Sequence, residues 1–105
     1  RANTTIGVIA TDAALTKAQC HRLAVAAHDG IARAIQPAHS PFDGDLLFAV
    51  STGTGPVVDD MALLELGHAA SVCVARAIAR GVFEATPWPG DVLPTWNNKK
   101  RKAQI

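Results

Sequence analysis

The sequence predicts an α/β chain in the order strand, helix, strand, helix, forming one part of a layered αββα or α/β body. Two short stretches are rich in β-branched residues and apolar on both faces, and each precedes a longer stretch with helical periodicity. Two such strands cannot be covered by two helices, so they need further strands beside them and another layer on the far face. With 105 residues the chain is one domain or a piece of one. We expect the missing part upstream or in a separate subunit.

The first strand is predicted within the stretch from Asn3 to Asp12, because residues 5–10 are almost continuously apolar. Two hydroxyl residues, Thr4 and Thr5, directly follow Asn3. If the Asn3–Thr4 bond is cut, Thr4 carries both a hydroxyl and a free α-amine, and a chain-terminal Thr can use its own amine as the activating base. A Thr that merely begins a strand is the more common case, so the pattern alone leaves both interpretations open.

The first helix is predicted to begin after Thr16 and to end at Pro37. Thr16 and Gln19 have the spacing of a capping box. Gly30 interrupts the helix at a cost of about 1 kcal/mol relative to Ala, which indicates close packing at that point. The apolar positions that recur with helical period are Cys20, Leu23, Ala24, Ala27, Ile31, Ala34 and Ile35.

Residues 37–44 have the composition of a loop, which ends in the turn dipeptide Asp43-Gly44. Residues 45–52 are predicted to form the second strand, again apolar on both faces. The sequence Gly53-Thr54-Gly55-Pro56 then breaks it. This segment lacks the Gly-Lys-Ser/Thr ending of a phosphate-binding loop, so it predicts a plain turn.

The second helix is predicted from about Asp59 to Phe83, with Asp59 or Asp60 as its N-cap. A polar stripe is expected at Arg76, Arg80 and Glu84, and a buried stripe at Leu63, Leu66, Ala70, Cys73, Ala77 and Gly81. Pro87 and Pro89 end the regular structure. Residues 87–105 are expected to form a C-terminal extension, which Trp88, Leu93, Pro94 and Trp96 could hold against a surface.

The net charge of +1 conceals an uneven distribution. Four of the ten basic residues are Lys99, Lys100, Arg101 and Lys102, and the other six face nine acidic residues. A basic tail on an acidic body can bind nucleic acid, but a solvated C-terminus is the commoner case, so we expect no nucleic-acid partner. No apolar run approaches the ~18 residues that span a bilayer, so no membrane partner is expected either.

Cysteine and histidine residues give no metal-binding pattern. Cys20 and Cys73 form no Cys-x-x-Cys pair, and both are predicted to be small buried residues in a reducing, cytoplasmic compartment. His21 and His28 are seven residues apart, which is the weakest kind of metal signal. All four histidines (His21, His28, His39, His68) are expected in surface or capping roles, without a metal.

Asp43 and Asp45 alternate across Gly44 at the start of the second strand. If the two strands are neighbours, both carboxylates approach the end of the sheet where Thr4 lies. One carboxylate can then accept a proton from Thr4 or orient its amine, and the other can polarise the first. An ordinary Asp-Gly turn is the alternative.

Several segments together resemble one family. They are residues 3–12, Ala26-Ala27-His28-Asp29-Gly30, Ile35-Gln36-Pro37 and His39-Ser40-Pro41-Phe42-Asp43-Gly44-Asp45. The chain resembles, roughly from Asn3 to Phe83, the DmpA-type aminopeptidases and their relatives, the nylon-oligomer hydrolases. These are hydrolases of the N-terminal-nucleophile type that cleave themselves into a large and a small chain. The resemblance implies that residues 1–86 form the nucleophile-bearing small-chain part and that the fold is a four-layer αββα sandwich assembled with an absent large chain.

The resemblance also implies roles for individual residues. Asn3–Thr4 matches the self-cleavage junction, Thr4 matches the nucleophile, and Asp43 and Asp45 match the acidic pair of the nylon-hydrolase branch. Further catalytic and oxyanion groups are expected on the large chain, the assembly is expected to oligomerise further, and no metal or organic cofactor is needed. Because Arg1, Ala2 and Asn3 precede Thr4, the chain as written is uncleaved or represents only a fragment.

The expected function is therefore hydrolysis of an amide bond in a small peptide or amino-acid oligomer, as an aminopeptidase or amidase. One alternative is acyl transfer to an amine, as in the ornithine acetyltransferases, which share a related fold and also cleave before a Thr. Another is a non-catalytic small chain that completes a partner's fold or binds nucleic acid through residues 99–102.

Overall fold

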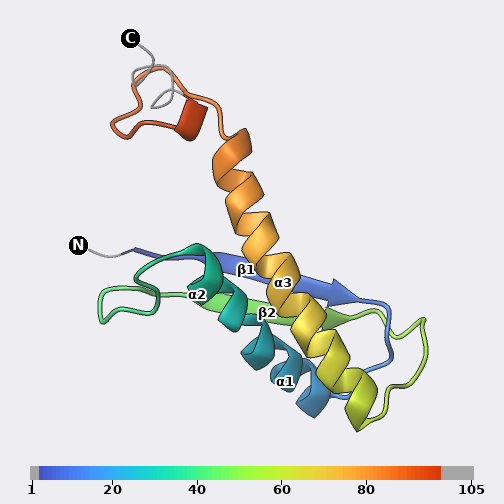
Figure 1. The fold of residues 1–105 in the computed structure, drawn as a ribbon. Helices are drawn as coiled ribbons and strands as arrows, with labels where there is room; N and C mark the ends of the chain where they lie inside the picture. The colour runs from blue at the N-terminus through green and yellow to red at the C-terminus, as the bar shows by residue number, and fades with distance from the viewer. Residues whose placement is uncertain (1–2, 98–105) are drawn as a thin grey trace.

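The computed structural model describes residues 3–97, which form two strands and three helices (Figure 1). In chain order these are β1 (Ile6–Thr11), α1 (Lys17–Ala27), α2 (Asp29–Ala34), β2 (Leu46–Ser51) and α3 (Asp60–Glu84). The predicted order of strand, helix, strand, helix is confirmed, except that the first helix is divided in two. The basic run at 99–102 lies outside the described residues.

The two strands are parallel neighbours, and α1 and α2 form the crossover that a parallel pair requires. Ile6 pairs with Leu46, and the register runs without a shift to Thr11 and Ser51. An isolated bridge between Asn3 and Asp43 keeps the same offset beyond the strand ends. The register therefore extends to the predicted cleavage junction.

All three helices cover one face of the sheet, and the core lies between them and β2 (Figure 1). Its buried members are Leu23, Ala27, Ile31, Leu47, Ala70 and Val74. Gly30 of α2 lies directly against α3, because a Cβ at this position would collide with the Ser71 carbonyl oxygen. The close packing expected at Gly30 is confirmed.

The predicted capping box is also confirmed. The Thr16 hydroxyl accepts a hydrogen bond from the Gln19 N–H (3.1 Å), and the Gln19 side chain accepts one from the Thr16 N–H (2.9 Å). The prediction of one continuous helix to Pro37 is wrong, because the helix breaks at His28 and α2 ends at Ala34. The break lets both α1 and α2 pack against α3.

The outer face of the sheet carries large apolar side chains that no described element covers. Ile6 is 67% exposed, Val8 62% and Phe48 52%, and Leu46 and Val50 are also exposed. On the inner face, Leu47 is buried and Ile9 packs against the core. The expectation that both faces of both strands are apolar is confirmed.

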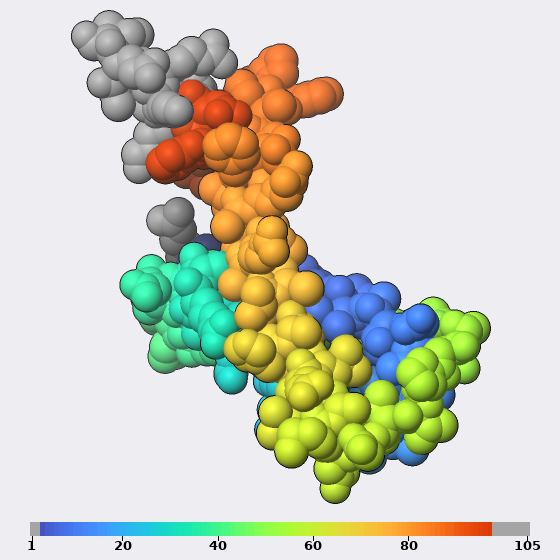
Figure 2. Space-filling view, turned by 45° about the vertical axis from the view of Figure 1, so that its right-hand side comes forward, coloured from blue at the N-terminus to red at the C-terminus, as the bar shows by residue number. Residues whose placement is uncertain are grey.

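The long helix α3 begins at the predicted cap, where the Asp59 carboxylate accepts a hydrogen bond from the Ala62 N–H (2.8 Å). Its first half packs on the body, and its second half projects away from it (Figure 2). Among the described helices only α3 is long and apolar enough to cross a membrane by length and composition, with a mean hydropathy of 1.4 over an 18-residue window. Core helices of globular proteins meet the same criterion.

The buried stripe predicted on α3 is only partly correct. Ala70 is buried, as are Gly67, Ser71 and Val74, but Cys73, Ala77 and Gly81 are exposed. Gly81 lies in the projecting half, where an added Cβ would meet nothing within 4 Å. Cys20 is half-buried, so neither cysteine is a fully buried core residue. The expected polar stripe is exposed, and it includes an Arg80–Glu84 ion pair of 3.7 Å.

Candidate active site

Thr4 lies at the end of the sheet where both strands begin, and the peptide before it is fixed by two backbone hydrogen bonds. The Asn3 N–H donates to the Phe42 carbonyl oxygen (3.1 Å), and the Asn3 carbonyl oxygen accepts from the Gly44 N–H (2.7 Å). The carbonyl of the predicted scissile bond is therefore already polarised by a backbone donor. A donor in that position stabilises negative charge that develops on this oxygen during nucleophilic attack.

Gly44 also makes room for the Thr4 side chain. A Cβ at Gly44 would lie 3.1 Å from Thr4 Oγ1 and 3.9 Å from Thr4 Cγ2. Thr4 is exposed, and its hydroxyl has no hydrogen-bond partner among residues 3–97. A nucleophile needs an accessible oxygen that is not committed to a structural bond, and Thr4 meets this requirement.

The Asp45 carboxylate takes the place of a backbone carbonyl as the acceptor for the Thr5 N–H. Asp45 Oδ1 accepts a hydrogen bond from the Thr5 N–H (3.2 Å), and the next ladder bond runs from the Leu46 N–H to the Thr5 carbonyl oxygen (2.9 Å). The other oxygen, Oδ2, accepts from the His39 N–H (3.2 Å) and lies 2.8 Å from His39 Nδ1. The Asp45 side chain is only 7% exposed, and these donors compensate for its burial.

Asp43 closes the turn that precedes the second strand. Its Oδ2 accepts a hydrogen bond from the Ser40 N–H (2.9 Å), and its own N–H donates to the Ser40 carbonyl oxygen (2.9 Å). Asp43 pairs with Asn3, and Asp45 binds the N–H of Thr5, so the two residues flank Thr4 on the neighbouring strand. The structure thus brings the three predicted site residues to one end of the sheet, and their catalytic roles stay predictions.

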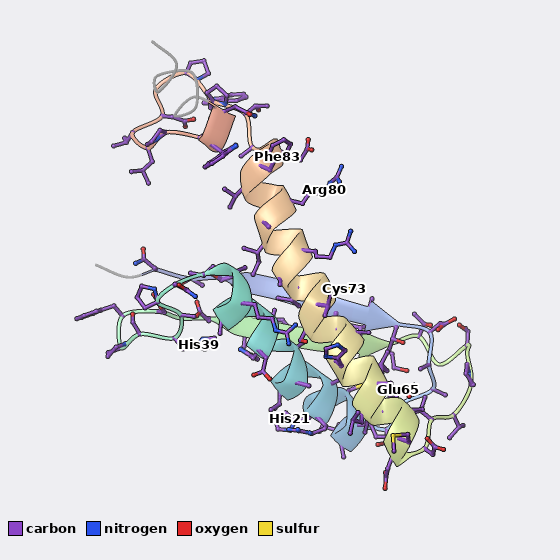
Figure 3. The ribbon with its side chains drawn as sticks, viewed as in Figure 1. His21, His39, Glu65, Cys73, Arg80 and Phe83 are labelled. Carbon is purple, nitrogen blue, oxygen red and sulfur yellow. The ribbon has the colours of Figure 1, made fainter. Side chains whose placement is uncertain are left out.

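His39 belongs to this site, although the sequence assigned it only a surface or capping role. It has a positive φ of 57°, and its ring centroid lies 5.5 Å from that of His28. It lies in the loop before β2, whereas His21 lies on α1, away from this end of the sheet (Figure 3). The sequence pattern gives no signal for this contact, because no spacing rule connects a histidine with a carboxylate six residues later. Within residues 3–97 no cluster of His, Cys, Asp or Glu residues could hold a metal ion.

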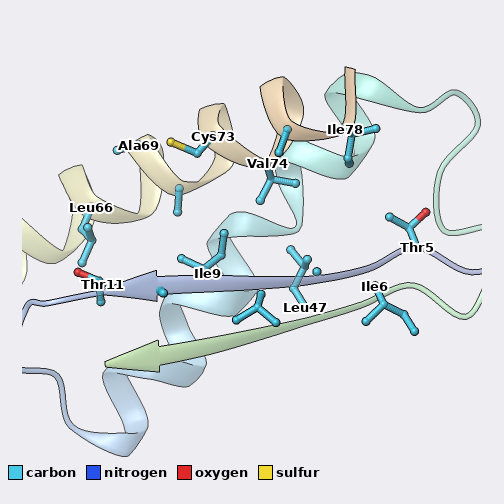
Figure 4. A pocket seen from close by; sticks show the side chains of 15 residues that line it. Thr5, Ile6, Ile9, Thr11, Leu47, Leu66, Ala69, Cys73, Val74 and Ile78 are labelled. Carbon is cyan, nitrogen blue, oxygen red and sulfur yellow. The ribbon is translucent and has the colours of Figure 1, made fainter. Parts of the chain in front are cut away.

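A groove of about 540 Å³ lies elsewhere, between α3 and the edge of β1 that β2 does not occupy. Leu66, Cys73 and Ile78 of α3 lie along it, above the strand (Figure 4). The groove is almost wholly apolar and reaches the candidate site only at Thr5. Its lining includes Thr5, Thr11 and Cys73 but no carboxylate, histidine or basic residue that could transfer a proton.

Comparison with known proteins gives relatives described as aminopeptidases and relatives described as oligomer endohydrolases. Two mycobacterial proteins described as uncharacterized aminopeptidases are similar to this chain. The one from Mycobacterium tuberculosis is 47% identical over 91% of this chain and 30% of its own length, and the one from Mycobacterium leprae is 46% identical over 90% and 28%. A 6-aminohexanoate-oligomer endohydrolase of Kocuria is 42% identical over 48% of this chain and 14% of its own length.

This chain therefore spans less than a third of the length of the mycobacterial relatives. The sequence profile of Peptidase family S58 matches residues 1–93, which include the whole of the candidate site. The predicted resemblance is confirmed: the chain belongs to peptidase family S58.

Proposed function

We propose that this chain is the nucleophile-bearing part of an amide hydrolase that matures by cleaving its own Asn3–Thr4 bond. Membership of the peptidase family and similarity to aminopeptidases and an oligomer endohydrolase support the reaction class. One observation supports the assignment of Thr4 as the nucleophile. Its hydroxyl is exposed and has no hydrogen-bond partner within residues 3–97, and it lies next to the Asn3 carbonyl, which the Gly44 N–H already polarises.

In maturation, Thr4 Oγ attacks the carbonyl carbon of Asn3, and the hydroxyl proton is transferred to the Thr4 nitrogen as the C–N bond breaks. The product is an ester between the Asn3 acyl group and Thr4 Oγ. Water then hydrolyses this ester, which leaves a carboxylate on Asn3 and a free α-amine on Thr4. The Gly44 N–H would stabilise the oxyanion of the first step, because it lies 2.7 Å from that oxygen in the uncleaved chain.

In turnover, the Thr4 hydroxyl attacks the amide carbonyl of a small peptide or amino-acid oligomer. The Thr4 amine or the Asp43 and Asp45 carboxylates transfer the proton to the departing amine, and water resolves the acyl-enzyme. Both oxygens of Asp45 already have partners in the uncleaved chain, so its first task is to hold the backbone at Thr5. Asp43, half-buried at the mouth of the turn, is the better candidate for proton transfer.

The chain is proposed to work within a larger assembly, an αββα sandwich built with the remaining part of the same protein. Two uncovered surfaces support this: the apolar outer face of the sheet and the groove at the free edge of β1. Cys73 and Ala77, which the sequence predicted to be buried, line that groove, so an added strand there would bury them. The outer face would receive the second sheet, and the mature assembly is proposed to oligomerise further.

The test uses the full-length protein that carries this chain, as wild type, as Thr4→Ala and as Thr54→Ala, a control that removes an exposed loop hydroxyl. Intact mass and N-terminal sequencing should show a chain that begins at Thr4 in the wild type and the control, and no cleavage in Thr4→Ala. Amide hydrolysis should follow the same pattern. A Thr4→Ala protein that still hydrolyses the substrate at the wild-type rate contradicts the proposal. Acyl transfer to an added amine, measured in the same assay, separates the transferase alternative.

A further inference from the structure

We propose that His39 is a positioning residue for the Thr4 nucleophile, acting through Asp45. It would hold the Asp45 carboxylate in the orientation that binds the Thr5 N–H, and so fix the backbone that carries Thr4. This inference rests on the proposed function of Thr4, and it concerns a residue to which neither the sequence pattern nor the similarity to relatives gives a part in the reaction.

The hydrogen bonds of Asp45 divide cleanly between its two oxygens. Oδ1 binds the Thr5 N–H, whereas the partners of Oδ2 within residues 3–97 both come from His39, namely its backbone N–H (3.2 Å) and its Nδ1 (2.8 Å). The carboxylate is nearly buried, so an Oδ2 without donors would be costly. Without His39 the carboxylate would rotate toward solvent, and Oδ1 would then release the Thr5 N–H.

Two features suit a histidine to this position. Its backbone lies in the left-handed region, with a φ of 57°, where Asn, Asp and His are the enriched non-glycine residues. That conformation directs both the main-chain N–H and the side-chain Nδ1 toward the same oxygen atom. The ring also contacts His28, which lies at the end of α1, so the orientation of His39 is linked to the helical layer.

The effect of His39 on the reaction follows because Thr5, which Asp45 holds, is bonded directly to Thr4. Thr5 is the next residue after Thr4, and its N–H belongs to the peptide that joins them. A shift of this peptide changes the approach of Thr4 Oγ to the Asn3 carbonyl carbon. Displacements of about 1 Å between reacting groups can slow a reaction by about 100-fold.

The experiment compares three substitutions at His39 in the full-length protein. His39→Asn keeps a nitrogen donor in the place of Nδ1 and tolerates a positive φ. His39→Asp has the same shape and the same backbone tolerance, but it presents an oxygen and a negative charge to Asp45. His39→Gly keeps the backbone relaxed and removes the side chain. The matched control is His21→Asp, the same change at an exposed histidine of α1.

Two quantities are measured: the rate at which a chain beginning at Thr4 appears, and hydrogen exchange at the Thr5 amide in a Thr4→Ala background. His39→Asn should cleave within about 3-fold of the wild-type rate, His39→Gly about 10-fold more slowly and His39→Asp about 100-fold more slowly. Protection of the Thr5 amide should fall in the same order, and His21→Asp should change neither quantity.

The inference is overturned if His39→Asn is as slow as His39→Gly, or if His39→Asp protects the Thr5 amide and cleaves as the wild type does. If His39→Asp does not fold, the comparison of His39→Asn with His39→Gly decides alone. Failure of the proposed function has a different signature, because Thr4→Ala would then leave the amide hydrolysis unchanged whatever stands at position 39. Exchange at the Thr5 amide still measures the role of His39 in that case.

Discussion

The two ends of the short sheet are built alike, but they use their hydroxyl groups differently. At both ends a side chain at the end of β2 accepts a hydrogen bond from the backbone that flanks β1. Asp45 accepts from the Thr5 N–H before β1, and Ser51 accepts from the Leu15 N–H (3.2 Å) after it. Ser51 Oγ also donates to the Ala13 carbonyl oxygen (2.6 Å). The Thr4 hydroxyl has no such bond within residues 3–97.

The same contrast holds for the other hydroxyls at the far end. Thr11 Oγ1 accepts from the Ala13 N–H (3.1 Å), and the hydroxyls of Thr52 and Thr54 bond to each other (3.2 Å). A hydroxyl that already serves the fold would lose that bond on becoming a nucleophile. The Ser40 hydroxyl, near Thr4, also accepts a hydrogen bond, from the Phe42 N–H (3.4 Å). Unlike all these hydroxyls, that of Thr4 is uncommitted and lies beside a polarised carbonyl, and on this ground we propose that its end of the sheet is the reactive one.

The largest effect is expected for Thr4→Ala in the full-length protein. Self-cleavage and amide hydrolysis should fall by about 1000-fold or more, because the attacking oxygen is gone. The free energy of unfolding should change by less than about 0.5 kcal/mol, since the side chain is exposed and unbonded. Thr4→Ser should retain cleavage. A large loss of stability in Thr4→Ala would show that this hydroxyl is structural after all.

The second largest effect is expected for Asp45→Asn. The amide keeps the shape of the carboxylate, but its nitrogen cannot accept a hydrogen bond, so either Thr5 or His39 loses its acceptor. We expect cleavage to slow by about 10- to 100-fold and the free energy of unfolding to fall by about 1–3 kcal/mol. Urea unfolding measures the free energy of unfolding, and the rate of cleavage is measured on the same preparation. Unchanged values for both would mean that Asp45 does not hold this end together.

A smaller effect is expected for Gly44→Ala. The new methyl group would lie 3.1 Å from Thr4 Oγ1, which is tighter than ordinary packing, so the hydroxyl must move. We expect cleavage about 10-fold slower, with a loss of stability of about 1 kcal/mol. The matched control is Gly81→Ala on α3, where an added Cβ meets nothing within 4 Å. The control should gain up to about 1 kcal/mol and cleave normally. Equal cleavage rates in Gly44→Ala and Gly81→Ala would show that the space at Gly44 does not matter for the reaction of Thr4.

Much of the reactive end could be predicted from the sequence, because it depends on local patterns. The strand, helix, strand order agrees with a parallel pair, but the sequence left open whether the two strands are neighbours, and only the structure gives the register that places Asp43 opposite Asn3. His39 escaped prediction for a physical reason. Its contact with Asp45 depends on a left-handed backbone conformation within an irregular loop, and no periodicity reports such a conformation.

The prediction of burial on α3 shows a second limit. Periodicity identified Cys73 and Ala77 as core positions, yet both line an open groove in the described chain. A hydrophobic pattern does not distinguish a surface buried within this chain from one that another part of a protein would bury, and this chain spans less than a third of its mycobacterial relatives. The break at His28 escapes prediction because a single Gly such as Gly30 is tolerated within a helix. The break lies where α1 and α2 both pack against α3.

The smallest effect on the reaction is expected for Ser51→Ala, which tests the structural end. Removal of the hydroxyl leaves the Leu15 N–H and the Ala13 carbonyl oxygen without their partner, so the free energy of unfolding should fall by about 1–3 kcal/mol. The cleavage rate, measured at a temperature where the variant is fully folded, should stay within about 2-fold of the wild type because Ser51 lies at the opposite end of the strands. If Ser51→Ala has normal stability but cleaves slowly, the distinction between the two ends of the sheet is wrong, because the Ser51 hydroxyl would then contribute to the reaction.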